Sequence, residues 1–458
     1  MGTYRCWFGA PSARLRRSHF GAPPARSVLG APPARRVLCA LAVIATSALA
    51  ACGSGSGATS GGGKSIQIWE GYTGAEGKAF THLVAEYQAT HPGVKVSSLF
   101  VNNDYTLQKV QTAVAGGNPP DIAYLYGSWA PNVAKLSGVV TLTNVVKRPG
   151  VNWNDFWVGE RDVATVNGRV IGVPALVDNL AVVYNKALFA KAHLPLPGPN
   201  WTWPQFVADA RKLTDPAIKQ FGTAYVTPGS EDTVWHWEAL LWEAGGTLLN
   251  SSNTKAAFDS KAGLASLNTL RTMSVTDHSM YLDPTDSAYA NLFNSGKIGM
   301  LVTGPWDLSG FPNVHYGVQI MPSFPGTNGG HQTISGPDNW VVFNNGASRV
   351  KTAEDFILWL TAPAQVKYFS LKTGDLPIRQ SAATTSFDAQ MDAALPEVST
   401  FISNLGNVRQ ARPQIATYPQ ISQAIGTMVV SVLLGKSQPA AALAAAAAKV
   451  NQILAGSG

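Results

Sequence analysis

The sequence predicts an α/β protein built from two lobes, and three observations indicate this fold class. Segments with a strand pattern alternate with segments with a helix pattern from residue 65 onward, at the spacing of parallel βαβ units. Hydrophobic residues make up 45% of the chain, and Gly and Pro are spread along its length, which excludes a disordered or collagen-like protein. The 458 residues leave 407 after residue 51, enough for two buried cores.

The first part of this region reads as strand, helix, strand, helix, strand. Residues 65–69 alternate polar and apolar side chains like a strand, and a glycine-containing turn at 71–74 follows. A helix is expected next, because apolar residues recur at positions i, i+3, i+4 and i+7: Phe80, Leu83, Val84 and Tyr87. The order then repeats, with a strand expected at 94–101, a helix at 105–114 and a strand at 120–126.

The rest of the chain is richer in helices. After a strand at 180–184, helices are expected at 203–213, 233–244, 262–273 and 288–294. Thr202 as N-cap and Pro204 near the start support the first of these. Strands are expected again at 298–302, 316–320 and 339–343. The last helix is expected at 440–454, where a run of alanines favours it.

The excess positive charge lies at the N-terminus. The chain has 34 Lys and Arg against 27 Asp and Glu, a formal charge of +7. Seven arginines and no acidic residue precede residue 52, so the remaining chain has equal numbers of each sign. The basic balance therefore does not indicate nucleic-acid binding, and no nucleic-acid partner is expected.

Residues 1–51 are expected to form a signal peptide, whose true translation start stays open. An apolar run at 37–51 is too short to span a bilayer and follows an arginine pair. It ends in Leu49-Ala-Ala-Cys52, which resembles the bacterial lipobox, where the thiol accepts a diacylglyceryl group. We therefore expect Cys52 to be the lipid-attachment site and residues 52–64 to be a flexible tether. The protein is then expected at the extracytoplasmic face of the cell membrane.

Neither a metal site nor a cofactor is expected. Cys6 and Cys39 both precede Cys52, so no disulfide framework and no Cys-based zinc site can form in the rest of the chain. The eight histidines show no ligand spacing.

Nine segments after the tether resemble, in family order, the solute-binding proteins of carbohydrate-uptake ABC transporters, the family of the maltodextrin-binding protein. They are Ile66-Gln-Ile-Trp-Glu-Gly71, Gly117-Asn-Pro-Pro-Asp-Ile122, Asn167-Gly-Arg-Val-Ile-Gly-Val-Pro174, Val183-Tyr-Asn-Lys186, Trp201-Thr-Trp-Pro-Gln-Phe206, Phe293-Asn-Ser-Gly-Lys-Ile-Gly-Met300, Gly304-Pro-Trp306, Tyr316-Gly-Val-Gln-Ile-Met-Pro322 and Thr373-Gly-Asp-Leu-Pro377. The resemblance implies a two-lobed periplasmic-binding-protein-like fold with a hinge and a ligand cleft between the lobes.

The motif order also implies where the lobes divide. Three crossings are expected, near residues 174–178, 333–336 and 392–396. Lobe I would then contain residues 65–175 and 337–392, and lobe II would contain residues 178–334 and 395–458. Each lobe is discontinuous in sequence.

The resemblance implies site residues as well. Trp306 follows Gly304-Pro305 at the end of an expected strand and matches a position that stacks on a sugar ring in this family. Trp235 matches a second aromatic platform, and Asp178 matches a hinge carboxylate that binds hydroxyls. The other candidates are aromatic or polar residues expected at the cleft: Tyr72, Tyr126, Trp129, Asp338, Asn339, Trp340 and Tyr418. Aromatic faces suit the C–H faces of sugars, and carboxylates and amides suit their hydroxyls.

Packing in the core is the competing interpretation of these side chains. It is expected for four other tryptophans, Trp69, Trp203, Trp242 and Trp359. It also stays open for Tyr418, and Asp178 could be no more than a cap. Residues 338–340 replace a small-residue loop of the maltodextrin-binding protein, which leaves the identity of the sugar open.

The function expected is that of a lipid-anchored, monomeric protein that delivers a sugar or oligosaccharide to the permease subunits of an ABC importer. Arg409 and Arg412 leave open a phosphorylated polyol such as a glycerophosphodiester. A secreted glycoside hydrolase is a further alternative, but no acid pair lies in a hydrolase motif, so no enzyme activity is expected. An adhesin or structural lipoprotein would bind no small molecule.

Overall fold

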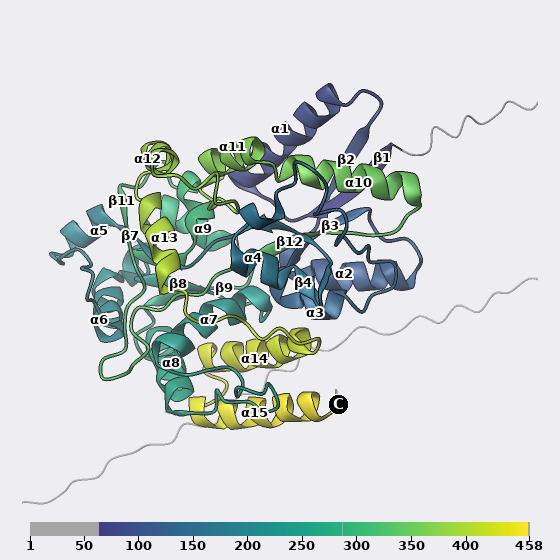
Figure 1. Ribbon diagram of the computed structural model, residues 1–458. Helices are drawn as coiled ribbons and strands as arrows, with labels where there is room; N and C mark the ends of the chain where they lie inside the picture. Colours follow the sequence, from purple (N-terminus) through teal and green to yellow (C-terminus); the bar gives the residue numbers. More distant parts are fainter. Residues whose placement is uncertain (1–63, 286, 457–458) are drawn as a thin grey trace, which may run out of the picture. The chain divides into compact units, whose positions relative to one another are not determined.

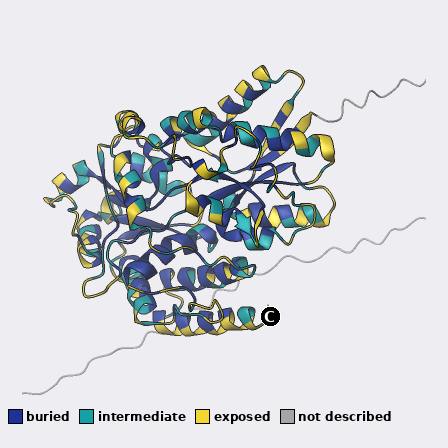
Figure 2. Cartoon of the chain, viewed as in Figure 1, coloured by how far each residue is buried: buried dark blue, intermediate teal, exposed yellow. Residues whose placement is uncertain are grey.

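Two β-sheets organise the part of the chain that the computed structural model describes, residues 64–285 and 287–456 (Figure 1). The expected signal peptide, Cys52 and the tether up to residue 63 lie outside the described residues. In Figure 2 the strands are mostly buried, and exposed residues gather on the outward faces of the helices.

The first sheet has five strands in the order β2-β1-β3-β12-β6. Their bounds are β1 Ser65–Glu70, β2 Lys95–Phe100, β3 Ile122–Tyr126, β6 Val173–Leu176 and β12 Asp338–Val342. β1 pairs in parallel with β2 and β3, and helices α1 (Gly74–Thr90) and α2 (Asn103–Ala115) connect these strands. The predicted order of strand, helix, strand, helix, strand is confirmed. β12 lies antiparallel between β3 and β6.

The second sheet is built around β7 (Ala181–Asn185), which pairs antiparallel with β10 (Met300–Thr303) and β11 (Tyr316–Gln319). A parallel pair, β8 (Thr223–Val226) and β9 (Met280–Asp283), extends it. The link is a bridge between Phe221 and Ile298, beside which the N–H of Met300 donates to the carbonyl of Gly222 at 2.9 Å. β8 and β9 were not expected from the sequence, because four-residue runs are too short for a periodic pattern.

Helices cover both sheets (Figure 1). Those beside the first sheet include α10 (Ala347–Leu360), which packs on β1 and β12, and α11 (Pro363–Thr373), which packs on α1. The larger helices beside the second sheet are α6 Trp203–Leu213, α7 Glu231–Glu243, α8 Lys261–Arg271, α14 Tyr418–Leu433 and α15 Pro439–Ala455. The shorter elements are α3 Ala130–Val133, α4 Val158–Val163, the hairpin of β4 Thr165–Val166 and β5 Arg169–Val170, α5 Lys186–Lys191, α9 Ala288–Asn294, α12 Thr385–Ala394 and α13 Val398–Asn404.

Helix α6 shows how local sequence and packing agree. Its buried residues recur at helical spacing: Trp203, Phe206, Ala210 and Leu213. At its start the N–H of Thr202 donates to Oε1 of Gln205 at 2.8 Å, which satisfies one donor that the helix leaves free. The helix runs over the eleven residues that the sequence predicts.

Helix α7 is buried on all sides, because it packs against α8, α14 and β8. It therefore carries buried acids as well as apolar residues. The carboxylate of Glu243 accepts from the indole N–H of Trp203 at 2.7 Å. Burial raises the pKa of Glu243 well above its usual value.

The chain passes from the first sheet to the second between β6 and β7, and returns between β11 and β12. The two connecting segments lie side by side, since Asn179 bridges Ser335 and the N–H of Gly336 donates to the carbonyl of Asp178 at 3.0 Å. A third segment joins them, because Val177 bridges Leu376. The lobe boundaries given above stay a prediction.

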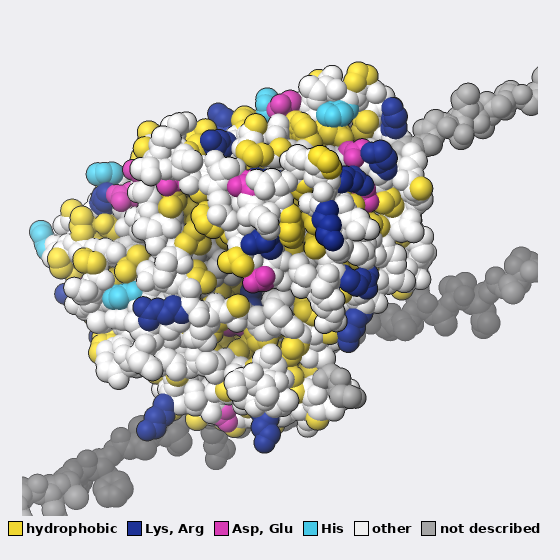
Figure 3. Space-filling view, in the orientation of Figure 1, with side chains coloured by type: hydrophobic (Ala, Val, Ile, Leu, Met, Phe, Trp, Pro, Cys, Tyr) yellow, Lys and Arg dark blue, Asp and Glu magenta, His cyan; other side chains and the backbone are white. Residues whose placement is uncertain are grey.

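Charged side chains of both signs are scattered over the face that Figure 3 shows. Among the described residues, no helix is both long enough and apolar enough to cross a membrane.

Candidate ligand-binding site

A cavity of about 490 Å³ opens among loops that follow strands of both sheets. Residues from the first sheet and its loops contribute Gly71, Thr73, Glu76, Phe100, Asn102, Asn103, Tyr124, Tyr126, Leu176 and Asp338. Residues from the second sheet and its helices contribute Glu231, Asp232, Trp235, Thr285, Ser287, Tyr289, Ala290, Trp306, Asp307 and Arg412. The segments that connect the sheets add Asp178 and Gly336.

The parallel strands explain why the first-sheet residues meet. Because β1, β2 and β3 run in the same direction, the loops after their carboxyl ends lie at one edge of the sheet. The loop after β1 is held by Glu70, which accepts from the N–H of Tyr72 at 2.7 Å. A Cβ on Gly71 would come within 2.1 Å of Oδ1 of Asn103, so only glycine lets the loops after β1 and β2 approach this closely.

Two tryptophans supply the aromatic surface of the cavity. Trp235 lies on α7 and Trp306 on the 3₁₀ helix η5 (Pro305–Gly310) that follows β10. Their ring centroids are 5.8 Å apart with planes inclined by 37°. Trp235 is 7% exposed, and its indole N–H has no hydrogen-bond partner. The pair offers an apolar surface with one unused donor beside it.

Most of the charged residues in the rest of the lining are acidic. Six lining residues are Asp or Glu, and Arg412 is the only Lys or Arg among the described residues that line the cavity. Nη1 of Arg412 donates to Oε1 of Glu231 at 2.8 Å, and both side chains are buried. Glu231 also accepts from the hydroxyl of Tyr418 at 2.9 Å and from Oγ of Ser422. Arg412 is therefore already paired inside the protein.

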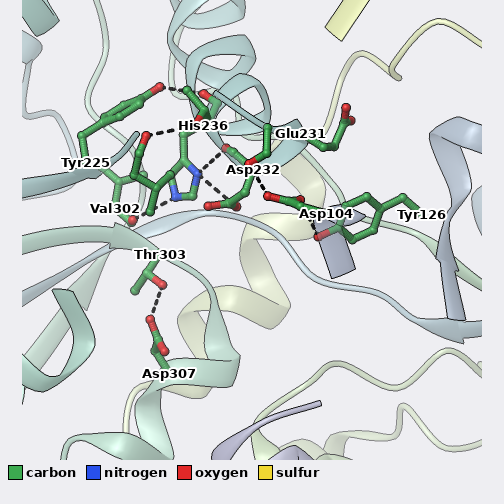
Figure 4. Close-up of polar contacts among 12 residues, drawn as sticks. Asp104, Tyr126, Tyr225, Glu231, Asp232, His236, Val302, Thr303 and Asp307 are labelled. Carbon is green, nitrogen blue, oxygen red and sulfur yellow. Dashed lines mark hydrogen bonds and ion pairs between the residues drawn. The ribbon is translucent and has the colours of Figure 1, made fainter. Parts of the chain in front are cut away.

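Two other carboxylates are held by neutral or charged donors (Figure 4). Oγ1 of Thr303 donates to Asp307 at 2.6 Å, while burial raises the pKa of Asp307 to about 6. Asp232 lies 3.4 Å from Nδ1 of His236. Burial alone would lower the pKa of His236, but the Asp232 carboxyl raises it. The two ring nitrogens face the carbonyls of Asp232 and Val302, and only the charged imidazole can donate to both.

Burial changes the titration of the remaining acids. It raises the pKa of Asp338 to about 7, although Asp338 accepts a hydrogen bond from the hydroxyl of Tyr124. Burial and the neighbouring Asp375 raise the pKa of Asp178 well above its usual value, and the same two causes raise that of Glu76.

Hydrogen bonds at the edge of the cavity join residues beside the first sheet to residues beside the second sheet. Asp104, at the start of α2, accepts from the hydroxyl of Tyr126 at 3.1 Å and from Oγ of Ser230, which precedes α7 (Figure 4). Nearby, Nδ2 of Asn132 donates to the carbonyl of Ala416 at 2.9 Å.

Five of the ten residues proposed from the sequence line the cavity: Tyr126, Asp178, Trp235, Trp306 and Asp338. The structure brings these together from five separate segments. Whether they bind a ligand stays a prediction.

The other five do not line the cavity: Tyr72, Trp129, Asn339, Trp340 and Tyr418. Tyr72 and Trp340 pack with each other, ring centroids 6.0 Å apart, in the apolar core behind the cavity. Trp129 packs on Tyr126 at 4.5 Å. Asn339 is buried on β12 with no hydrogen-bond partner for its amide atoms. Tyr418 is fully buried and supports Glu231 from behind.

Several lining residues were missed as ligand contacts by sequence reasoning. Glu76, Asn102 and Asn103 follow the carboxyl ends of the parallel strands β1 and β2, and Asp307 follows the antiparallel strand β10. For the first three that position was the available signal, because the carboxyl edge of parallel strands is where α/β proteins place ligands. Within residues 64–285 and 287–456, no group of His, Cys, Asp and Glu is placed to hold a metal ion.

The sequence matches the bacterial extracellular solute-binding proteins over residues 71–367. The chain belongs to this family. It is therefore a solute-binding protein of an ABC importer, as the sequence predicted, and its fold is that of the two-lobed periplasmic solute-binding proteins.

Solved structures and relatives agree with this membership. The cyclic α-maltosyl-1,6-maltose binding protein of Arthrobacter globiformis is 27% identical, with a TM-score of 0.68 over 86% of this chain and 99% of that one. An ABC transporter solute-binding protein of Thermotoga lettingae, bound with α-D-tagatose, is 25% identical, with a TM-score of 0.76 over 85% and 100%. The sn-glycerol-3-phosphate-binding periplasmic protein of Pectobacterium atrosepticum is 22% identical over 405 residues, 85% of this chain and 91% of that protein.

Proposed function

We propose that the protein binds a sugar or oligosaccharide in the 490 Å³ cavity and delivers it to the permease subunits of its ABC importer. The observation that carries this proposal is the Trp235–Trp306 pair beside carboxylates in one cavity. A sugar presents apolar C–H faces and a rim of hydroxyls, so it needs both kinds of surface at once. Two structurally similar proteins carry names or bound ligands of this class.

A glycerophosphodiester or glycerol phosphate is the second candidate. It is favoured by Arg412 in the cavity lining and by similarity to a glycerol-3-phosphate-binding protein. The lining opposes it, since Arg412 is already paired with Glu231 and is the only Lys or Arg among the described residues that line the cavity. We therefore place the sugar first.

We propose that the protein binds its ligand without chemical change. A glycoside hydrolase needs one acid that gives a proton and a second that acts on the sugar carbon or on water, about 5 to 10 Å apart. The adjacent acids Glu231 and Asp232 do not form such a pair, because Glu231 is held by Arg412 and Asp232 by His236.

Further proposals from the sequence concern closure of the two lobes, the monomeric state and attachment to the membrane. We propose that lobe I (residues 65–175 and 337–392) and lobe II (178–334 and 395–458) close on the ligand about the connecting segments. The bridges between Val177 and Leu376 and between Asn179 and Ser335 support a shared hinge there. We also propose that the protein is a monomer, held at the membrane by lipid on Cys52.

Calorimetric titration with a panel of neutral mono- and oligosaccharides, sn-glycerol 3-phosphate and glycerophosphocholine tests the ligand class. A ligand at 100 times its Kd should also stabilise the folded protein by about 2.7 kcal/mol in thermal unfolding. Saccharide binding without hydrolysis products is the expected result. Tight binding of the phosphates alone would replace the sugar with the second candidate, and product formation would show an enzyme.

A further inference from the structure

Three carboxyl groups meet beside the connecting segments, and two of them, Asp178 and Glu76, line the cavity. Val177 and Leu376 form an antiparallel bridge, which places the next residue, Asp178, opposite Asp375. Glu76, in the first turn of α1, lines the same cavity, and after burial the neighbouring Asp375 is the next largest cause that raises its pKa. We call these three residues the acidic end of the cavity.

The acidic end lacks a cationic partner inside the protein. Asp178 is 6% exposed and Asp375 is 1% exposed, so both are cut off from bulk water. Oδ1 of Asp178 is buried without a hydrogen-bond partner. In the part of the chain that the structure describes, no Lys, Arg or His forms an ion pair with any of the three. Asp178 therefore presents an unused acceptor to the cavity.

The other acids of the cavity differ in this respect. Glu231 is neutralised by Arg412, and Asp232 is paired with His236. Asp307 and Asp338 each accept from a hydroxyl, of Thr303 and Tyr124 respectively. Asp178, whose Oδ1 has no partner, therefore differs from these four acids.

The acidic end also adjoins the aromatic surface. The N–H of Gly336 donates to the carbonyl of Asp178, and a Cβ on Gly336 would lie 3.2 Å from the ring of Trp235. A sugar ring lying against Trp235 would therefore carry its substituents toward Asp178.

We infer that the ligand is an amino sugar or an oligosaccharide of amino sugars, whose ammonium group binds Asp178 and Glu76 while a ring lies against Trp235 and Trp306. This inference rests on the proposed function and narrows its substrate class. Burial raises the pKa of Asp178 and of Glu76, which favours their neutral form as long as no cation lies beside them. An ammonium group supplies N–H donors together with a positive charge that favours the ionised carboxylates, whereas a neutral sugar supplies hydroxyls alone.

Matched saccharides test whether the site prefers an amino sugar or a neutral sugar. Glucosamine oligomers from fully deacetylated chitosan, cello-oligosaccharides and N-acetylchito-oligosaccharides share length and β-1,4 linkage and differ only at carbon 2. Calorimetric titration of each into the protein, together with glucosamine against glucose, measures what the amino group contributes. We expect the amine-bearing member of each pair to bind about tenfold more tightly or better.

Variants assign that preference to the acidic end. Asp178→Asn should remove most of the preference for the amine, and Glu76→Gln should reduce it, while neutral saccharides change little. Asp259→Asn, at an exposed site away from the cavity lining, should leave both affinities as in the wild type. Thermal unfolding of each variant establishes that it is folded before its affinities are compared.

Equal or tighter binding of the neutral member in every pair would overturn the inference and leave the proposed function standing. The inference is also overturned, and the proposed function again stands, if Asp178→Asn and Glu76→Gln both keep the amine preference. If none of these saccharides and none of the neutral panel binds, the proposed function fails, and this inference fails with it.

Discussion

The indole ring of Trp306 lies directly over Gly304, the residue two positions before it. A Cβ on Gly304 would fall 1.7 Å from Cζ3 of that ring, so no other residue leaves the tryptophan where it is. The backbone at Gly304 has φ −106°, which any residue adopts, so the requirement comes from the ring alone. Glycine here sets the position of an aromatic surface and not the shape of a turn.

Replacement of that glycine should act on binding and not on folding. In Gly304→Ala the methyl group displaces the ring of Trp306, so we expect saccharide affinity to fall about tenfold, or about 1.4 kcal/mol. Gly310→Ala is the matched control, because a Cβ there meets no atom within 4 Å. Titration and melting of both variants check this. Wild-type affinity in Gly304→Ala would show that the ring does not touch the ligand.

Trp306 itself should separate binding from core packing. The ring is partly exposed in the cavity, and stacking a sugar on it removes apolar area from water. Trp306→Ala should therefore lose about 2 to 3 kcal/mol of binding, or about 30- to 150-fold in Kd. Trp237→Ala, at a fully buried site in α7, should instead lose about 3 to 5 kcal/mol of unfolding free energy. A Trp306→Ala protein that melts far lower yet binds normally would contradict the cavity role.

Stability of the ligand-free protein should fall as pH rises. Burial raises the pKa of Asp375 to about 7, against about 3.9 in an unfolded chain, so between these values the folded state holds a proton that the unfolded state has lost. The stabilisation that comes from the protonated Asp375 carboxyl group is present in full below about pH 4 and is lost by about pH 7. Asp375→Asn cannot ionise, so its melting temperature relative to wild type should rise between about pH 4 and about pH 7. Parallel pH profiles for both proteins would disprove this assignment.

The lipid anchor has a separate test. Cys52→Ser removes the sulfur to which the lipid would be attached, so the protein should leave the membrane fraction. Its saccharide affinity should stay unchanged, since the substitution alters no residue that lines the cavity. Membrane association of the variant would refute the lipobox interpretation.

Local patterns were enough for most of the fold. The helix at Trp203–Leu213 was predicted to the residue, because its start signal and its buried stripe agree. β8 and β9 were missed, since their pairing with each other and with β10 is a tertiary fact that four residues cannot encode.

The site was predictable only in part. Trp306 and Asp178 match positions of the family, so their place beside the cavity could be expected from the sequence. Tyr72 lies in the loop after β1 and Trp340 in the middle of β12, and the side chains of both turn toward Phe80 and the core. The direction of a side chain depends on what packs behind it, and that information comes from segments far away in the chain.

β12 lies between β3 and β6, and its Asp338 meets Tyr124 across 214 positions of sequence. The first sheet therefore cannot be completed until the ribosome has made most of the chain. Contacts of such long range slow folding, because a large loop must close before they form. For a protein of an extracellular family this delay has a use. The chain stays unfolded for longer than a protein whose contacts join residues close in sequence. While it is unfolded, it can pass through a secretion channel.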